Sequence, residues 1–209
     1  MSRPTDIRLT NVRYETERYD YRSPMKFGGR VVRDVVLFNV STEVESRDGR
    51  RGTGFGSMTM GNIWAWAGGV TDPQVTLDVM IEFAESLVQC VNGFKEFGHP
   101  LELVYDFSKE YAALAERLEK KHALQESMPK LAQLVAASPW EASLFDAFGD
   151  RFDAEGEGKA NGAGDDVSGG IVVRIQNNHH PTNRKEQILM RQPWGATRWG
   201  SDSRATPFA

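Results

Sequence analysis

The sequence has little cysteine, no long apolar run and no large excess of charge. Cys90 is the one cysteine among 209 residues, which excludes an intrachain disulfide framework and a zinc site built from thiolates. No apolar run reaches the roughly 18–20 residues that a membrane span needs, and the N-terminus lacks the basic-then-apolar build of a signal peptide. A net charge of −4 does not favour nucleic-acid binding by bulk electrostatics. We therefore expect a cytoplasmic protein that binds neither nucleic acid nor a membrane.

The first sixty residues have the alternation of β-strands. An extended segment begins at Ile7, and residues 31–44 place apolar side chains alternately on two faces. An Asp-Gly turn signal follows, and residues 51–60 then alternate glycine with larger side chains. These glycines leave one face of the third strand almost bare, so we expect another element to approach it closely. The pattern predicts a three-stranded antiparallel meander.

The middle of the chain has helical spacing. Residues 71–73 (TDP) are a helix start signal, and apolar side chains then recur every three or four residues as far as Val91. Cys90 falls beside this apolar stripe, where a free cysteine behaves as a small hydrophobic residue. A second helix is expected from about Ser108 and a third over residues 131–135.

A fourth helix is expected to begin at residues 138–141 (SPWE). The serine and the glutamate have the spacing of a capping box, and the proline suits the first turn of a helix. Gly149 is placed to end this helix. We therefore predict a helix boundary immediately before Pro139.

The composition changes abruptly after Gly149. Residues 149–170 hold seven glycines, and beyond the short apolar run at 171–175 no sustained period of 2 or 3.6 follows. We divide the chain into a folded domain over residues 1–149 and a Gly-rich tail, disordered or non-native, over residues 150–209. The expected fold class is α+β: a meander followed by a helical bundle, with an irregular C-terminal tail.

Two stretches of sequence resemble a known family. They are residues 23–29 (SPMKFGG), between the first two expected strands, and residues 137–149 (ASPWEASLFDAFG). Together they resemble the N-terminal capping domain of the enolase superfamily, in its mandelate racemase and muconate lactonizing enzyme branch. Relative to the family's run of residues, Glu141 replaces the usual Asp, Ser143 the usual second Ala and Phe145 the usual His. The resemblance covers roughly residues 5–149.

The resemblance implies a chemistry that needs more than this chain holds. Family members abstract a proton α to a carboxylate with a Lys or His base while Mg²⁺ stabilises the enediolate, and these groups lie on a (β/α)₈ barrel. Such a barrel takes about 250 residues, and 61 follow Phe148. We therefore expect no barrel, no catalytic residue and no metal ligand here, and no cofactor in this chain, although Mg²⁺ is expected for the full-length family.

The loops that cover the barrel mouth in the family do have counterparts. By position they are Met25, Lys26 and Phe27 in the first loop and Trp64 in the second. An apolar ring beside one cation suits a carboxylate-bearing small molecule, and loop closure would exclude water. The alternative is that Phe27 and Trp64 pack onto the sheet while Lys26 is solvated.

Other polar residues are weaker candidates for a site. The pair His179-His180 cannot easily point both side chains at one metal ion, and an exposed loop is the better interpretation. Asp165-Asp166 lies in a Gly-rich acidic stretch and is expected to be a solvated loop.

Two hypotheses of different class follow. The first is a truncated mandelate racemase-like protein, whose parent class comprises racemases, epimerases and dehydratases, and which is inactive alone and binds a carboxylate only if a barrel completes it. The second is a stand-alone α+β binding or dimerisation module without catalysis, which leaves a homo-oligomer open. For this module the Gly-rich strand and residues 64–66 are the candidate surface.

Overall fold

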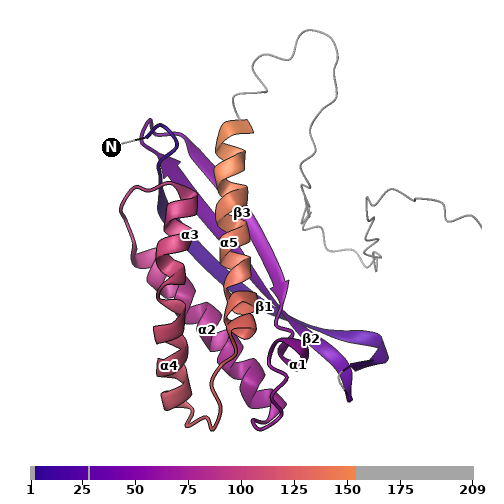
Figure 1. The fold of residues 1–209 in the computed structure, drawn as a ribbon. Coiled ribbons are helices and arrows are strands. Elements are labelled where there is room, and N and C mark those ends of the chain that lie inside the picture. Colours follow the sequence, from indigo (N-terminus) through magenta and orange to yellow (C-terminus); the bar gives the residue numbers. More distant parts are fainter. Residues whose placement is uncertain (1–2, 28, 154–209) are drawn as a thin grey trace, which may run out of the picture. The chain divides into compact units, whose positions relative to one another are not determined.

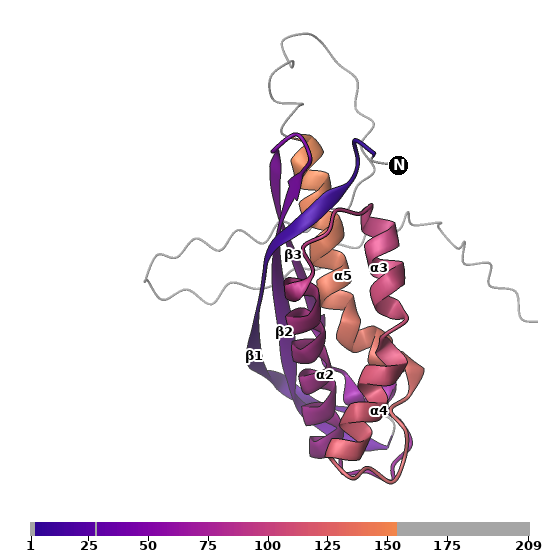
Figure 2. The ribbon, with the colours of Figure 1, turned by 90° about the vertical axis from the view of Figure 1, so that its left-hand side faces the viewer.

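A computed structural model describes residues 3–27 and 29–153 of the chain. These residues form a three-stranded antiparallel sheet in the order β1-β2-β3, with helices on one of its faces (Figures 1 and 2). The elements are β1 (Ile7–Phe27), β2 (Arg30–Ser46), β3 (Arg51–Thr59), α1 (Asn62–Ala65), α2 (Pro73–Gly93), α3 (Pro100–Ser108), α4 (Tyr111–Lys121) and α5 (Lys130–Asp153). The predicted α+β class, a meander followed by helices, is confirmed. No helix in the described ranges is long and apolar enough to cross a membrane.

The core lies between the sheet and the helices. Alternate residues of β2, among them Phe38, Val40 and Val44, turn their side chains toward the helices and are almost completely buried. From the helical side α2 contributes Val79 and Phe83, which are also buried. This burial of apolar surface between one sheet face and one helical layer is the main stabilising term for such a fold.

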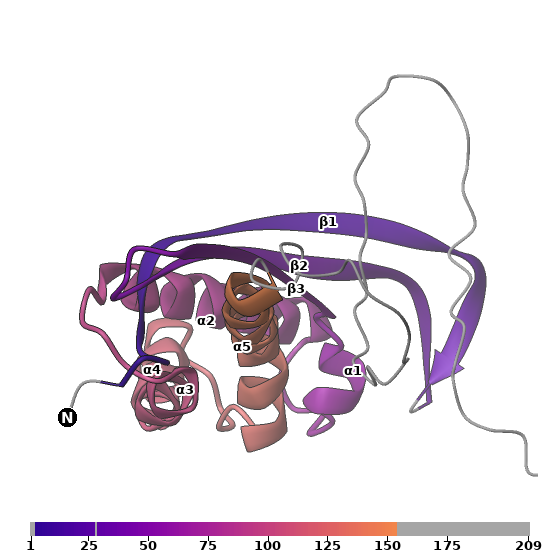
Figure 3. The ribbon, with the colours of Figure 1, turned by 90° about the horizontal axis from the view of Figure 1, so that it is seen from above.

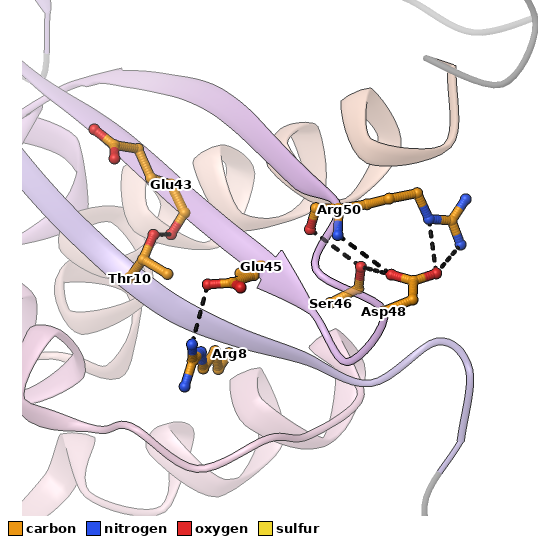
Figure 4. A network of polar contacts seen from close by, with 7 residues as sticks. All are labelled: Arg8, Thr10, Glu43, Glu45, Ser46, Asp48 and Arg50. Carbon is orange, nitrogen blue, oxygen red and sulfur yellow. Dashed lines mark hydrogen bonds and ion pairs between the residues drawn. The ribbon is translucent and has the colours of Figure 1, made fainter.

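The turn between β2 and β3 is held by a local polar network. Gly49 has a positive φ of 85°, which a glycine adopts without strain. Asp48 accepts hydrogen bonds from the Ser46 hydroxyl and from Arg50, whose Nε lies 2.8 Å away (Figure 4). The hydrogen bond from the Arg50 guanidinium, followed by that from Ser46, lowers the pKa of Asp48 well below its usual range. The predicted Asp-Gly turn is thus confirmed, with a carboxylate that fixes both of its ends.

Glycines on β3 let α5 approach the sheet at backbone distance. Added Cβ atoms at Gly52, Gly54 and Gly56 would lie only 2.1–2.2 Å from backbone atoms of α5. The predicted close approach of another element to this strand is confirmed, and the element is α5. The face of β3 proposed as a free binding surface is therefore covered, and that part of the prediction is wrong.

Side chains of α5 also occupy the outer edge of β3. Asp146 accepts the Phe55 N–H at 2.8 Å, and Asp150, one helical turn later, accepts the Thr53 N–H at 3.0 Å. The four-residue spacing on the helix matches the two-residue spacing on the strand. Unpaired N–H groups on an edge strand invite pairing with another chain, so these two carboxylates protect the edge.

Two helices of the structure, the four-residue α1 and α3, are not predicted by the sequence. The start of α2 is as predicted, with Asp72 as the N-cap that accepts the Gln74 N–H at 2.8 Å. The longer of the two unpredicted helices is α3, whose N-cap is His99 and whose first residue is Pro100. Because α3 ends at Ser108, α4 begins three residues later than expected, at Tyr111.

The predicted helix boundary before Pro139 is wrong, because α5 runs unbroken from Lys130 to Asp153. Proline has no N–H for the carbonyl of Val135, and the Ser138 hydroxyl donates to that carbonyl instead, at 2.9 Å. Glu141 does not close a capping box, since its carboxylate accepts the Tyr111 hydroxyl at 2.8 Å. One hydroxyl therefore satisfies the acceptor that proline leaves unpaired, and the helix also continues through Gly149.

A charged contact joins α2 to the end of α4. Glu82 accepts hydrogen bonds from the Lys121 ammonium and pairs with the His122 ring at 2.7 Å. The Lys121 bond is the main cause that lowers the pKa of Glu82 from the ordinary 4.5, against the opposing effect of burial.

This contact predicts a pH-dependent contribution to stability. A carboxyl group with a lowered folded-state pKa stabilises the fold above its unfolded-state pKa, and the contribution is lost as the pH falls through the folded-state value. We expect Glu82→Gln to unfold more easily than the natural chain at pH 7, and the difference to shrink as the pH falls below about 4.5. Urea unfolding at pH 7 and pH 3 measures this. An equal difference at both values would contradict the assignment.

Candidate functional site

The β1–β2 hairpin extends well past the third strand. β3 pairs only with Leu37–Glu45 of β2, so residues 18–27 and 29–36, here called the hairpin end, form a two-stranded ribbon. Figure 3 shows that the hairpin end curves toward the side of the sheet that carries the helices. This curvature brings it over the region of α1.

An irregularity in β1 accompanies the bend. Asp20 pairs with Asp34 and Met25 pairs with Val32, so four residues of β1 lie opposite a single residue of β2. Such bulges bend a strand and redirect its side chains, and Pro24 within the bulge has no N–H to place in the ladder. The segment 23–27, expected as a loop, instead belongs to β1 and pairs with β2 as far as Phe27.

The short helix α1 presents Trp64 beside the hairpin end. Its neighbours anchor it: Asn62 donates to the Pro73 carbonyl at 2.6 Å, and Ala65 and Trp66 are buried. Trp64 itself remains 40% exposed. Its indole lies so close to Gly61 that a Cβ there would meet Nε1 at 2.0 Å. The residues flanking α1 therefore fix the position of an indole that is open to solvent.

The hairpin end, α1 and the start of α2 enclose a hollow of about 460 Å³. Its apolar lining includes Met25, Phe27 and Trp64, all substantially exposed. Arg18 and Arg33 are also among the residues that line it. The volume lies within the range of roughly 300–1,000 Å³ that small-molecule sites occupy.

The charge of the hairpin end is opposite to that of the chain. Residues 18–35 hold five basic side chains and two acidic ones, whereas the whole chain has a net charge of −4. Arg18 pairs with Asp34 at 2.5 Å. Arg33 forms no ion pair with any residue in the described ranges. Of the two arginines that line the hollow, Arg18 is therefore paired with a carboxylate and Arg33 is not, within the described ranges.

The structure brings together three of the four residues predicted as a substrate-contacting set. Met25, Phe27 and Trp64 line the hollow, and Lys26 does not. The cause is strand alternation, since residues 25 and 27 of β1 share one face and residue 26 points to the other. Sequence reasoning missed Arg18 and Arg33, which only the pairing of β1 with β2 brings to this hollow.

The other candidate residues give no second site. Cys90 is exposed, so the prediction that it packs as a small hydrophobic residue is wrong. Of residues 64–66, only Trp64 is open to solvent. Within residues 3–27 and 29–153, no three His, Cys, Asp or Glu side chains come together in a way that could hold a metal ion. The pairs at 165–166 and 179–180 and the run at 171–175 lie outside the described residues.

Comparisons with known proteins find likeness in solved structures alone. No protein-family model matches the chain, and no curated protein matches it either. Similar structures include an L-talarate/galactarate dehydratase from Salmonella typhimurium LT2, at 18% identity and a TM-score of 0.35 over 68% of this chain and 30% of that one. A mandelate racemase/muconate lactonizing protein from Herpetosiphon aurantiacus matches at 17% identity and a TM-score of 0.29, over 70% of this chain and 31% of that one.

A third similar structure is an enolase from Bradyrhizobium complexed with magnesium and mandelic acid. It matches at 16% identity and a TM-score of 0.34, over 69% of this chain and 32% of that one. The chain thus spans about a third of the length of the structures that it matches. Two of these structures bear the names enolase and mandelate racemase/muconate lactonizing protein, which are names of the family that residues 23–29 and 137–149 resemble.

Proposed function

We propose that the hairpin end and α1 are the substrate-covering part of an enzyme that acts on a small organic acid, with catalysis supplied by a domain outside residues 3–153. The observation that carries this proposal is the hollow itself, whose lining includes Phe27, Trp64 and Arg33. Its location on a ribbon that projects past β3, rather than in the core, suits a part that closes over a ligand held elsewhere.

The residues of the hollow match the chemistry of a carboxylate with an apolar or hydroxylated body. A guanidinium offers a planar pair of N–H donors that fits the two oxygens of a carboxylate. Aromatic side chains such as Phe27 and Trp64 suit the apolar part of the same molecule. The ligands named for similar structures, mandelic acid and L-glucarate, belong to this chemical class.

The role proposed for the described residues is to position the substrate. No cluster of metal-ligating side chains occurs among residues 3–27 and 29–153, so these residues do not fit a magnesium ion such as the one in the Bradyrhizobium enolase. We propose that this part orients the carboxylate through Arg33 and excludes water through Phe27 and Trp64. A racemase, epimerase or dehydratase completed by a separate catalytic domain is the enzyme class that fits this role.

Binding of mandelate to the purified chain tests the proposal. Saturation-transfer NMR should show saturable binding with a dissociation constant in the millimolar range. The affinity is expected to be low because the contacts that the catalytic domain would make with the acid are missing. Arg33→Gln should weaken binding by about tenfold, as expected when one charged hydrogen bond is lost. Lys26→Gln is the matched control: it removes one positive charge two residues from the turn, but outside the hollow, and should change binding less than twofold. Equal loss in both variants would mean that net charge alone attracts the acid.

A further inference from the structure

The outward side of α5 is apolar, which is unusual for an exposed helix. From residue 131 to residue 145 its outward positions are Leu131, Leu134, Ser138, Ala142 and Phe145, here called the α5 stripe. The three large side chains are 48%, 45% and 40% exposed. A surface helix normally carries charged and polar residues on this side. Figures 1 and 3 show no other helix or strand of the described ranges lying over it.

The spacing of the residues in the α5 stripe is the same in both directions along the helix. Its members are separated by three, four, four and three residues, so the spacing is symmetric about Ser138. When two such helices run antiparallel with their Ser138 residues at the same level, Leu131 of one lies level with Phe145 of the other. A small residue then stands at the centre, where the two backbones come closest. Self-complementarity of this kind is what a two-fold symmetric contact requires.

We propose that the α5 stripe is the contact surface for a second copy of this chain, with the two α5 helices antiparallel about Ser138. The proposal does not depend on the hollow, because none of the residues that line the hollow lies on α5. It gives the homodimer a defined geometry, in which each large apolar residue on one copy meets the apolar stripe on the other.

Charges at the two ends of the stripe favour the antiparallel arrangement. Lys130 precedes the stripe and forms no ion pair with any other residue of the described ranges. Asp146 and Asp150 follow it, and both accept N–H groups of β3. Antiparallel packing brings Lys130 of one copy to the level of Asp146 of the other, whereas parallel packing would place like charges together.

The size of the stripe sets the expected strength of the contact. Fourteen residue steps of helix span about 21 Å. Such a surface is smaller than the roughly 800 Å² per partner of a standard stable interface. We therefore expect a reversible dimer with a dissociation constant on the order of micromolar rather than a permanent one.

Sedimentation equilibrium on the full 209-residue chain tests the proposal. The natural chain should change from monomer to dimer as its concentration rises through the micromolar range. The double variant Leu134→Lys/Phe145→Lys puts charges into the stripe at positions that are already exposed, and should weaken association at least tenfold. Val70→Lys, at a residue that is 63% exposed and distant from α5 in sequence, is the matched control and should leave it unchanged.

Disulfide formation tests the geometry independently. In a Cys90→Ser background, Ser138→Cys places a thiol on the two-fold axis, and mild oxidation should give a covalent dimer within minutes. The natural chain, whose exposed Cys90 lies on α2, is the control and should cross-link much more slowly. A chain that stays monomeric at high micromolar concentration, or equal association of the stripe variant and the Val70 control, would overturn the proposal.

Discussion

Alanine in place of Gly54 is expected to lower the free energy of unfolding by about 3 kcal/mol, the upper part of the usual range for overpacking a core. A Cβ at this position would lie 2.1 Å from the Ala147 nitrogen and 2.2 Å from the Ser143 carbonyl oxygen. Both obstacles are backbone atoms of α5, so no side-chain rotation can relieve the clash. Urea unfolding of the variant at pH 7 measures the loss.

Gly149→Ala on the helix that Gly54 contacts is the matched control. Nothing lies within 4 Å of a Cβ at Gly149, and the residue sits inside α5. Alanine should therefore stabilise the protein by roughly 0.5–1 kcal/mol, the ordinary cost of glycine within a helix. Destabilisation by Gly149→Ala, or a neutral Gly54→Ala, would contradict the packing of α5 on β3.

Replacement of Trp140 by alanine should cost about 3–5 kcal/mol, as is typical for removal of a large aromatic side chain from a core. Trp140 is 1% exposed, and its ring packs edge-to-face on Phe107 with centroids 5.4 Å apart. It lies directly after Pro139, in the middle of α5. The side chain therefore links α5 to α3, and its removal leaves a cavity that neither helix can fill.

Trp64→Ala is the comparison variant for this prediction. Trp64 is 40% exposed and contacts the hollow rather than the core, so its truncation should cost less than about 1 kcal/mol. Thermal unfolding of both variants measures the difference. Similar losses for the two variants would mean that Trp64 is a core residue, and the hollow would lose its aromatic wall.

Local patterns in the sequence were sufficient for much of the fold. Alternation in residues 31–44 predicts β2, and the Asp-Gly signal predicts its turn, because both depend on neighbours in the chain. The glycines of β3 also predict that another element packs closely there. The identity of that element could not be predicted, because the contact between β3 and α5 joins residues about ninety positions apart.

The unbroken course of α5 could not be predicted from local rules. Ser138-Pro139 is a favourable helix start in isolation, and the hydroxyl bond to Val135 that permits continuation depends on the preceding residues already being helical. The long hairpin is a similar case. The segment with Pro24 has weak strand character, and it becomes part of β1 because β2 provides a partner along its length.

The sequence predicted the apolar residues that line the hollow but not the arginines. Met25, Phe27 and Trp64 could be proposed from their position in the chain, but the cation could not, since Lys26 alternates away from them. Arg33 lies opposite the bulge between Asp20 and Met25, and this pairing of β2 with β1 places it among the lining residues. The register between β1 and β2 depends on pairing between distant residues, so it could not be predicted from the sequence of either strand alone.

The most direct test of the account is a map of amide chemical-shift changes in the isotope-labelled chain as mandelate is added. If the hairpin end and α1 form the acid-binding hollow, the changes will concentrate in residues 18–36 and 61–64 and will vanish in Arg33→Gln. The core strand pairs of β2 and β3 will stay unchanged. Shifts spread over the protein, or confined to α2–α5 with none at the hairpin end, would contradict it.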